Sequence, residues 1–263
     1  MTLFVNNCAD LRLLIYLIGY PDKGESQVVL IIDQTDGSVL MSGVIDCYAY
    51  QNVNRTADIL KTHNVKALDF FCWTHTDDDH SVGTSDIIDN FCNKSTQFFL
   101  PEGIYGNEHD FTSYSKHIQE AIDKVNGGNK GQHYNLSTIT TAERSSMHLD
   151  SLSRRFTDKG RQYIDFSIVG LAPNSAIIRR RILTGLTNKN DSSIALKIQF
   201  GYFSAFMTGD IENQTIRRIM PDHFRHLNYI KTPHHTSISS DALLDKIDEV
   251  YQAGDDLPIA CST

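Results

Sequence analysis

A buried-looking strand that runs directly into a segment rich in acidic and imidazole side chains constrains this chain most. The apolar stretch "KALDFFCWTH" is typical of a strand inside a sheet, and "HTDDDH", from His75 to His80, adds two histidines and three aspartates. Adjacent carboxylates repel one another unless water or a cation compensates them. A loop at the end of a buried strand is where α/β proteins place their sites. The pattern predicts an α/β fold with a polar site at a sheet edge, the alternative being a solvated acidic turn.

The residue types in this loop are those that bind transition metals. His75, Asp77, Asp79 and His80 offer imidazole and carboxylate groups, which bind Zn²⁺, Mn²⁺ or Fe²⁺. The spacing H-x-D-x-D-H does not place all four side chains on one face of a regular element. A tight loop around two ions would use all of them.

Two later segments repeat the pattern at other predicted strand ends. Asp210 follows a strand and a glycine in "FMTGDIE", and His234 and His235 follow a strand in "IKTPHHTSISS". Carboxylate or imidazole groups thus follow three strands that are far apart in sequence. This pattern predicts a metal site whose ligands come together when the chain folds.

The remaining chain predicts alternating strands and helices in a single domain, 1–263. Further strands are expected in "LRLLIYLIG", "QVVLIID", "SVLMSGVIDCYAY", "YIDFSIVGLAP" and "SSIALKIQF". Helices are expected in "NRTADILKTHNV", in "SVGTSDIIDNFCNK" with Ser85 as cap, in "IENQTIRRIM" and in "SSDALLDKIDEVYQ". The polar residues from about 105 to 160, with a helix in "SYSKHIQEAIDKV", are interpreted as an insertion or lid.

Composition limits the classes of partner. The net charge of −8 argues against a general attraction for nucleic acid. Five cysteines without a CxxC pair argue against a disulfide framework and a thiolate zinc site. No apolar run reaches the ~18–20 residues of a membrane span, and the N-terminus does not resemble a signal peptide. We therefore expect a cytoplasmic protein with no membrane partner.

The order HxDxDH, then TGD, then HH resembles the metallo-β-lactamase-like hydrolase superfamily. The aspartate at position 77 is similar to the branch typified by the metallo-β-lactamase domain of bacterial competence (DNA-uptake) proteins. The resemblance covers about residues 1–100 and 160–263. Counterparts of that branch's other motifs are Ala9-Asp10, Asp46 in "VIDCY", Asn190 and Ser193 in "NDSSIAL", and Lys231 in "KTPHHTS".

The resemblance implies a four-layer αββα sandwich with two divalent ions, Zn²⁺ or Mn²⁺, at one edge of the sheets. By position, His75 and Asp77 would bind one ion. Asp79, His80 and His235 would bind the other, and Asp210 would bridge the two. Three residues would have catalytic roles: Asp79 holding the activated water, Lys231 meeting a phosphate oxygen, and His234 orienting its neighbour or facing substrate.

Some family features are altered here. Thr236 replaces a glycine, and a glycine pair is reduced to Gly83. The additional histidine common in the family stays unassigned among His109, His117, His133 and His148. The chain stops at "LPIACST", where relatives continue, so the C-terminus is expected to be trimmed or the chain to be part of a longer protein.

The predicted function is a metal-dependent phosphodiesterase or nuclease that acts on nucleic acid or a nucleotide through a dinuclear, metal-activated water. The clusters Arg154–Arg161 and Arg179–Arg181 are candidates for a phosphate-binding rim, although a solvated surface is the favoured reading of both. One alternative is hydrolysis of an amide, ester or thioester. Another is a partner-dependent subunit of a bacterial multi-protein system, for example in defence.

Overall fold

The computed structural model describes residues 2–6, 10–20, 24–102, 114–126, 134–158, 162–184 and 190–262. Within these residues the chain forms two compact units. Unit 1 contains the described residues up to 100 and those from 114 to 137, and unit 2 contains 101–102 and the described residues from 138 to 262. The described residues form two β-sheets with helices, so the predicted α/β class is confirmed. The layer order of the predicted sandwich stays a prediction.

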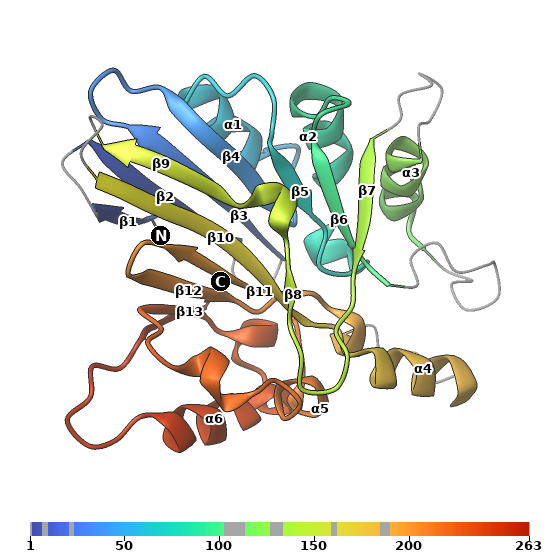
Figure 1. Cartoon of the computed structure of the whole chain (residues 1–263). Coiled ribbons are helices and arrows are strands. Elements are labelled where there is room, and N and C mark those ends of the chain that lie inside the picture. The colour runs from blue at the N-terminus through green and yellow to red at the C-terminus, as the bar shows by residue number, and fades with distance from the viewer. Residues whose placement is uncertain are drawn as a thin grey trace. The chain divides into compact units, whose positions relative to one another are not determined.

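The first sheet has the strand order β1 to β7 (Figure 1). Its strands are β1 (Thr2–Asn6), β2 (Leu11–Tyr20), β3 (Gly24–Asp33), β4 (Val39–Ile45), β5 (Phe70–Cys72), β6 (Gln97–Pro101) and β7 (Asn135–Ile139). The strands β1 to β4 are antiparallel, and β4, β5 and β6 are parallel. Nearly all residues of β3 and β5 are buried, because these strands lie inside the sheet.

Three helices belong to unit 1: α1 (Arg55–Thr62), α2 (Thr84–Phe91) and α3 (Lys116–Val125). Helix α1 contacts β3, and α2 contacts both other helices. The predicted cap at Ser85 is wrong, since α2 begins at Thr84 with Gly83 as its N-cap. Gly83 approaches so closely that a Cβ there would lie 2.5 Å from Sγ of Cys47, and this packing fixes where the helix starts.

The second sheet contains β14 (Ile259–Cys261), β13 (Tyr229–Lys231), β12 (Phe203–Met207), β11 (Ala195–Phe200), β10 (Gln162–Ala172) and β8 (Met147–His148), in that order, with β9 (Arg154–Asp158) also paired to β10. The strands β10, β11 and β12 are antiparallel, whereas β12, β13 and β14 are parallel. The helices of unit 2 are α4 (Ser175–Thr184), α5 (Asn213–Ile216) and α6 (Ala242–Val250). Apolar side chains of α5, α6, β10 and β12 share one buried cluster.

Short 3-10 helices complete the described chain: η1 (Asp78–His80), η3 (Asp150–Leu152), η4 (Asn190–Ser192), η5 (Pro221–Phe224), η6 (Pro233–Thr236) and η7 (Ile238–Ser240). Two of them, η1 and η6, contain the histidines that the sequence singled out. The predicted site segments therefore lie in tight turns between regular elements.

The polar segment at about 105–160 supplies the predicted helix, α3, and also sheet strands. Strand β7 belongs to the first sheet, and β8 and β9 pair with β10. The role of this segment as a lid stays a prediction. Of its four unassigned histidines, His117 and His148 are exposed, and His109 and His133 lie outside the described residues.

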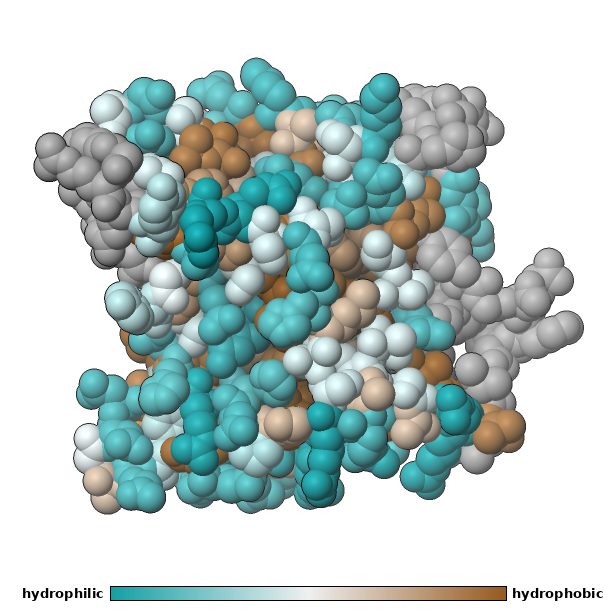
Figure 2. All heavy atoms as spheres, in the orientation of Figure 1, coloured by the Kyte–Doolittle hydropathy of each residue, from teal (hydrophilic) through white to brown (hydrophobic). Residues whose placement is uncertain are grey.

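Hydrophilic residues cover much of the face drawn in Figure 2, with hydrophobic residues among them. Within the described ranges, no helix combines the length and the apolar character that crossing a bilayer requires.

Candidate functional site

Three strand ends of unit 1 meet at one edge of the first sheet. Strands β4 and β5 are parallel, with Ile45 opposite Cys72, so the residues that follow them lie side by side. Strand β3 runs antiparallel to β4, with Gln27 opposite Ile45, so β3 begins where β4 ends. This topology brings Asp46, Glu25 and the loop after β5 to the same edge, as expected for a site at strand ends.

Asp46 is fully buried and organises this edge. Its Oδ1 accepts a hydrogen bond from the backbone N–H of Thr74 at 2.7 Å, and its Oδ2 accepts from the Thr74 hydroxyl at 2.6 Å. Nδ1 of His80 lies 2.8 Å from the same Oδ2. A charged acceptor with several short hydrogen bonds holds its donors firmly. Asp46 adopts a positive φ of 55°, a conformation that aspartate tolerates better than most residues.

The hydrogen bonds around Asp46 also define which nitrogen of each histidine carries the proton. Because the carboxylate only accepts, His80 donates from Nδ1. The hydroxyl of Thr74 donates to Asp46, so Nδ1 of His75, 3.0 Å from that hydroxyl oxygen, donates to it. Both histidines then present Nε2 as a lone-pair donor, the form that binds a metal.

His75, Asp79 and His80 offer ligand atoms within 4.8 Å of one another. Nε2 of His80 lies 3.9 Å from Oδ2 of Asp79, and Nε2 of His75 lies 3.6 Å from Oδ2 of Asp77. Both imidazoles are buried, whereas the two carboxylates are about one-third exposed. Imidazole nitrogen and carboxylate oxygen within this distance fit a divalent transition-metal ion.

The middle aspartate of the cluster has a different position. Asp78 is exposed, and its Oδ1 accepts a hydrogen bond from the hydroxyl of Ser115, the residue that caps α3. Asp78 therefore connects the loop to α3.

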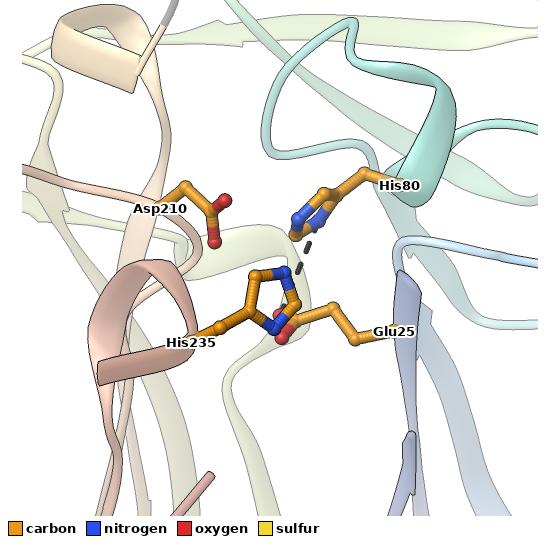
Figure 3. Close-up of side chains that lie close together, drawn as sticks. All are labelled: Glu25, His80, Asp210 and His235. Atoms are coloured by element: carbon orange, nitrogen blue, oxygen red, sulfur yellow. Dashed lines mark ion pairs between the residues drawn. The ribbon is translucent and has the colours of Figure 1, made fainter. Parts of the chain in front are cut away.

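Glu25, near the start of β3, is a fully buried carboxylate that the sequence pattern did not single out. Its Oε1 lies 4.0 Å from Nδ1 of His80, and the pair is marked by the dashed line in Figure 3. Gly24 packs so closely that a Cβ there would lie 2.4 Å from the carbonyl oxygen of Asp79. The Gly24-Glu25 dipeptide was the sequence signal that could have identified this acid.

The acid that the resemblance indicated near the N-terminus, Asp10, lies elsewhere. Strands β2 and β3 are antiparallel, and Leu11 pairs with Asp33 at the end of this hairpin opposite to Glu25. Ten residues of strand separate the two ends, roughly 30 Å. The structure therefore places Glu25, and not Asp10, beside the histidines of unit 1.

Unit 2 presents its own pair of ligand-type side chains. Asp210 and His235 offer ligand atoms within 4.8 Å of each other, and both are drawn in Figure 3. Asp210 follows β12, and its backbone N–H donates to the Ser193 hydroxyl at 3.0 Å. This contact connects the turn before β11 to the TGD segment.

Lys231, at the end of β13, is almost fully buried in the same loop cluster. Its Nζ donates to the carbonyl oxygen of Gly209 at 2.9 Å and lies 3.5 Å from Oδ1 of Asp210. These contacts fix the turn that carries Asp210. The described geometry thus gives Lys231 a positioning role, and the phosphate contact expected for it stays a prediction.

His234 takes part in a hydrogen-bonded group that includes an acid the sequence analysis did not select. Its Nδ1 lies 3.3 Å from Oε1 of Glu212 and 3.1 Å from the hydroxyl oxygen of Ser239. The side-chain amide of Asn190 donates to the same Glu212 oxygen at 3.2 Å. The His234 side chain is about one-third exposed, so part of it is accessible.

The backbone of η6 is unusual, because three successive residues have positive φ. The angles are 46° at His234, 48° at His235 and 65° at Thr236. Glycine adopts this region without strain, whereas a β-branched residue does not. A glycine would therefore suit the backbone at position 236 better than threonine.

Comparisons with known proteins give distant matches only. No family model and no curated protein matches the sequence. Among solved structures, a putative metal-dependent hydrolase from Parabacteroides distasonis is similar at 12% identity and a TM-score of 0.42, over 100% of this chain and 97% of that chain. A metallo-β-lactamase from Pontibacter korlensis matches at 10% identity and a TM-score of 0.37, over 94% and 96%.

A diphosphatase of the PhnP family matches at 12% identity and a TM-score of 0.39, over 86% of this chain and 69% of that chain. At these identities and TM-scores the similarity assigns neither a family nor an activity to the chain. The resemblance to the competence-protein branch stays a prediction.

Proposed function

We propose that this chain is a metal-dependent hydrolase that cleaves phosphodiester bonds of nucleic acid or a nucleotide. The proposed ligands of two divalent ions, Zn²⁺ or Mn²⁺, are His75, Asp77, Asp79, His80, Asp210 and His235. The observation that carries the proposal is the hydrogen-bond network of Asp46, which leaves Nε2 of both His75 and His80 as electron-pair donors beside carboxylates.

The alternative of a solvated acidic turn accounts for Asp78 but not for its neighbours. A solvated turn needs no buried histidines, and His75 and His80 are both buried. Nor does it need a buried carboxylate such as Asp46 to orient them. Burying and orienting ionisable groups is costly and is characteristic of functional sites.

Bound divalent ions would act as Lewis acids that lower the pKa of water and neutralise developing negative charge. The residues of the chain would prepare that chemistry. Asp46, directly for His80 and through the Thr74 hydroxyl for His75, holds both imidazoles in the tautomer that is protonated at Nδ1 and offers the lone pair of Nε2. Asp79, partly exposed, would accept a hydrogen bond from the attacking water, and His234 would contact a substrate oxygen.

Charge in unit 2 supports a phosphodiester substrate. Helix α4 contacts η4, the turn next to the Asp210-binding Ser193, and carries the exposed Arg179 and Arg180. Guanidinium groups match phosphate geometry well. The other basic cluster contributes less, because Arg155 forms an ion pair with Asp165 at 2.6 Å.

The first experiment is a metal count by mass spectrometry on protein purified without chelator. We expect about two transition-metal ions per chain, in line with a two-metal hydrolase, and their loss in the Asp79→Ala/Asp210→Ala double variant. The control is Asp58→Ala/Asp248→Ala, which removes two exposed acids, one from each unit. A wild type that binds neither Mn²⁺ nor Zn²⁺ on titration would contradict the proposal.

A substrate screen with Mn²⁺ and Zn²⁺ then tests the bond type. Cleavage of DNA, RNA or a nucleotide phosphodiester, lost in Asp79→Ala, is the expected result. If only amides, esters or thioesters were hydrolysed, the proposal of phosphodiester cleavage would be wrong. Metal binding with turnover only after a partner protein is added would favour the partner-dependent subunit.

A further inference from the structure

We propose that Glu25 is a positioning residue of the metal site, whose buried carboxylate strengthens cation binding through His80. This inference rests on the metal site of the proposed function. It adds a residue that lies outside the six proposed ligands.

The position of Glu25 is fixed by the strand that carries it. It is the second residue of β3, its side chain is fully buried, and Nε2 of Gln27 donates to its Oε1 at 3.1 Å. The preceding Gly24 packs directly against the carbonyl of Asp79. Glu25 therefore has little freedom to turn away from the loop after β5.

Glu25 and Asp46 each place a carboxylate oxygen near the same nitrogen of His80, Nδ1. Oδ2 of Asp46 is 2.8 Å from Nδ1, within hydrogen-bonding distance, whereas Oε1 of Glu25 is 4.0 Å from it. Asp46 thus determines which ring nitrogen of His80 carries the proton and how the ring is oriented. Glu25 lies beyond hydrogen-bonding distance and acts on the same ring through its charge. The opposite nitrogen, Nε2, lies 3.9 Å from Oδ2 of Asp79.

Two buried carboxylates beside one imidazole make the environment of His80 strongly favourable for positive charge. Electrostatic interactions are strong where water is excluded. A cation bound by His80 would polarise the imidazole, and the negative charge near Nδ1 would stabilise this polarisation. Carboxylate partners of metal-binding histidines commonly change metal affinity by about 10–100-fold.

The same arrangement has a cost when no cation is bound. Two carboxylates within 4.0 Å of one nitrogen repel each other in a buried environment. Replacing Glu25 with glutamine keeps the shape and removes the charge. The inference therefore predicts opposite effects on the metal-free and the metal-bound protein, which a purely structural role does not.

The test uses Glu25→Gln and titrates metal-free protein with Mn²⁺ by calorimetry, with thermal unfolding measured in parallel. We expect Mn²⁺ affinity to fall about 10–100-fold. We also expect an equal or higher Tm without metal, and a smaller rise in Tm on adding Mn²⁺. The matched control is Glu120→Gln, which removes a half-exposed charge from α3 of the same unit and is expected to leave the affinity within about twofold of the wild type.

Glu25→Asp gives a second measurement if the glutamine variant does not fold. It keeps the charge but moves it away from His80, so we expect a loss of affinity by a factor of about 2–10. Wild-type affinity in either folded variant would overturn the inference while leaving the proposed metal site intact. A wild type that binds no divalent ion would overturn both.

Discussion

The two loops that carry the candidate ligands are built in different ways. In unit 1, the loop from Thr74 to His80 is held by side-chain hydrogen bonds that converge on Asp46. In unit 2, the turn from His234 to Thr236 is defined by a backbone with three successive positive φ angles. The first arrangement depends on a buried acceptor, and the second depends on a conformation that its residues adopt at a cost.

This difference has a direct energetic meaning. Removing the acceptor of the first loop should leave buried donors without an acceptor and destabilise the protein. Replacing the strained residue of the second loop with one suited to its backbone should stabilise it. Substitutions that are expected to change the free energy of unfolding in opposite directions therefore test the comparison between the two loops.

The largest effect is expected for Asp46→Ala. The backbone N–H and hydroxyl of Thr74 and Nδ1 of His80 all lose their acceptor, and we expect the free energy of unfolding to fall by about 3–5 kcal/mol. Chemical denaturation of metal-free protein measures this change. Asp58→Ala, which removes an exposed acid on α1, is the control and should change stability by less than about 0.5 kcal/mol. Equal stability of the two variants would show that Asp46 does not hold the loop.

Gly24→Ala tests the packing of β3 against the same loop. The new Cβ would lie 2.4 Å from both the Asp79 carbonyl oxygen and a ring carbon of Tyr48, so we expect a loss of about 2 kcal/mol and weaker metal binding. Gly37→Ala is the control, because Gly37 also has a positive φ but has open space around it. If both variants lost the same stability, backbone strain and not close packing would explain the result.

Thr236→Gly tests the second loop and is expected to stabilise the protein, in contrast to the two preceding variants. Glycine adopts a φ of 65° without the strain of a β-branched residue, so we expect the free energy of unfolding to rise by about 1 kcal/mol. The loss of the hydrogen bond from the Thr236 hydroxyl to the His235 carbonyl, and the freedom that glycine adds to the unfolded chain, offset part of the strain that is relieved.

The neighbouring Ser237→Gly is the control for that variant. Ser237 has a φ of −61°, where glycine relieves no strain. Glycine there adds freedom to the unfolded chain and removes the hydroxyl that accepts from the Ser239 backbone N–H. It should lower stability by about 0.5–1 kcal/mol. A loss of stability in both variants would contradict the strain assigned to the turn.

The smallest effect is expected outside both loops, at His63. Burial lowers the pKa of His63 below its usual value. The unfolded chain therefore binds more protons as the pH falls below about 6.5, and the contribution of neutral His63 to stability is progressively lost. Stability measured between pH 7 and pH 5 should fall less steeply in His63→Gln than in the wild type, and parallel curves would exclude this contribution.

Strands β2, β3, β4 and β5 of the first sheet were predictable from their apolar runs, whereas β6 and β7 were not predicted. The same logic located His75, Asp79 and Asp210 just after strands, because ligand-type residues stand out directly behind an apolar run. Local patterns are sufficient for such features.

Features that depend on strand register were not predictable in the same way. Glu25 lies inside a strand, and only the pairing of β3 with β4 brings it to the edge beside His80. Asp10 had an equally suggestive local context but lies at the opposite end of the hairpin. The start of α2 at Thr84 follows the close packing of its N-cap, Gly83, against Cys47, which is distant in sequence.

The hydrogen bond from the Thr74 backbone to Asp46 also makes local opening of the protein measurable at the candidate site. This amide lies where β5 ends, and its acceptor is the carboxylate that orients His80. Exchange of the Thr74 amide proton with solvent requires that bond to break, so exchange reports the opening of the loop at its Asp46 acceptor. The exchange rate of this one proton would therefore report how often, and at what free-energy cost, the loop opens beside the proposed ligand His80.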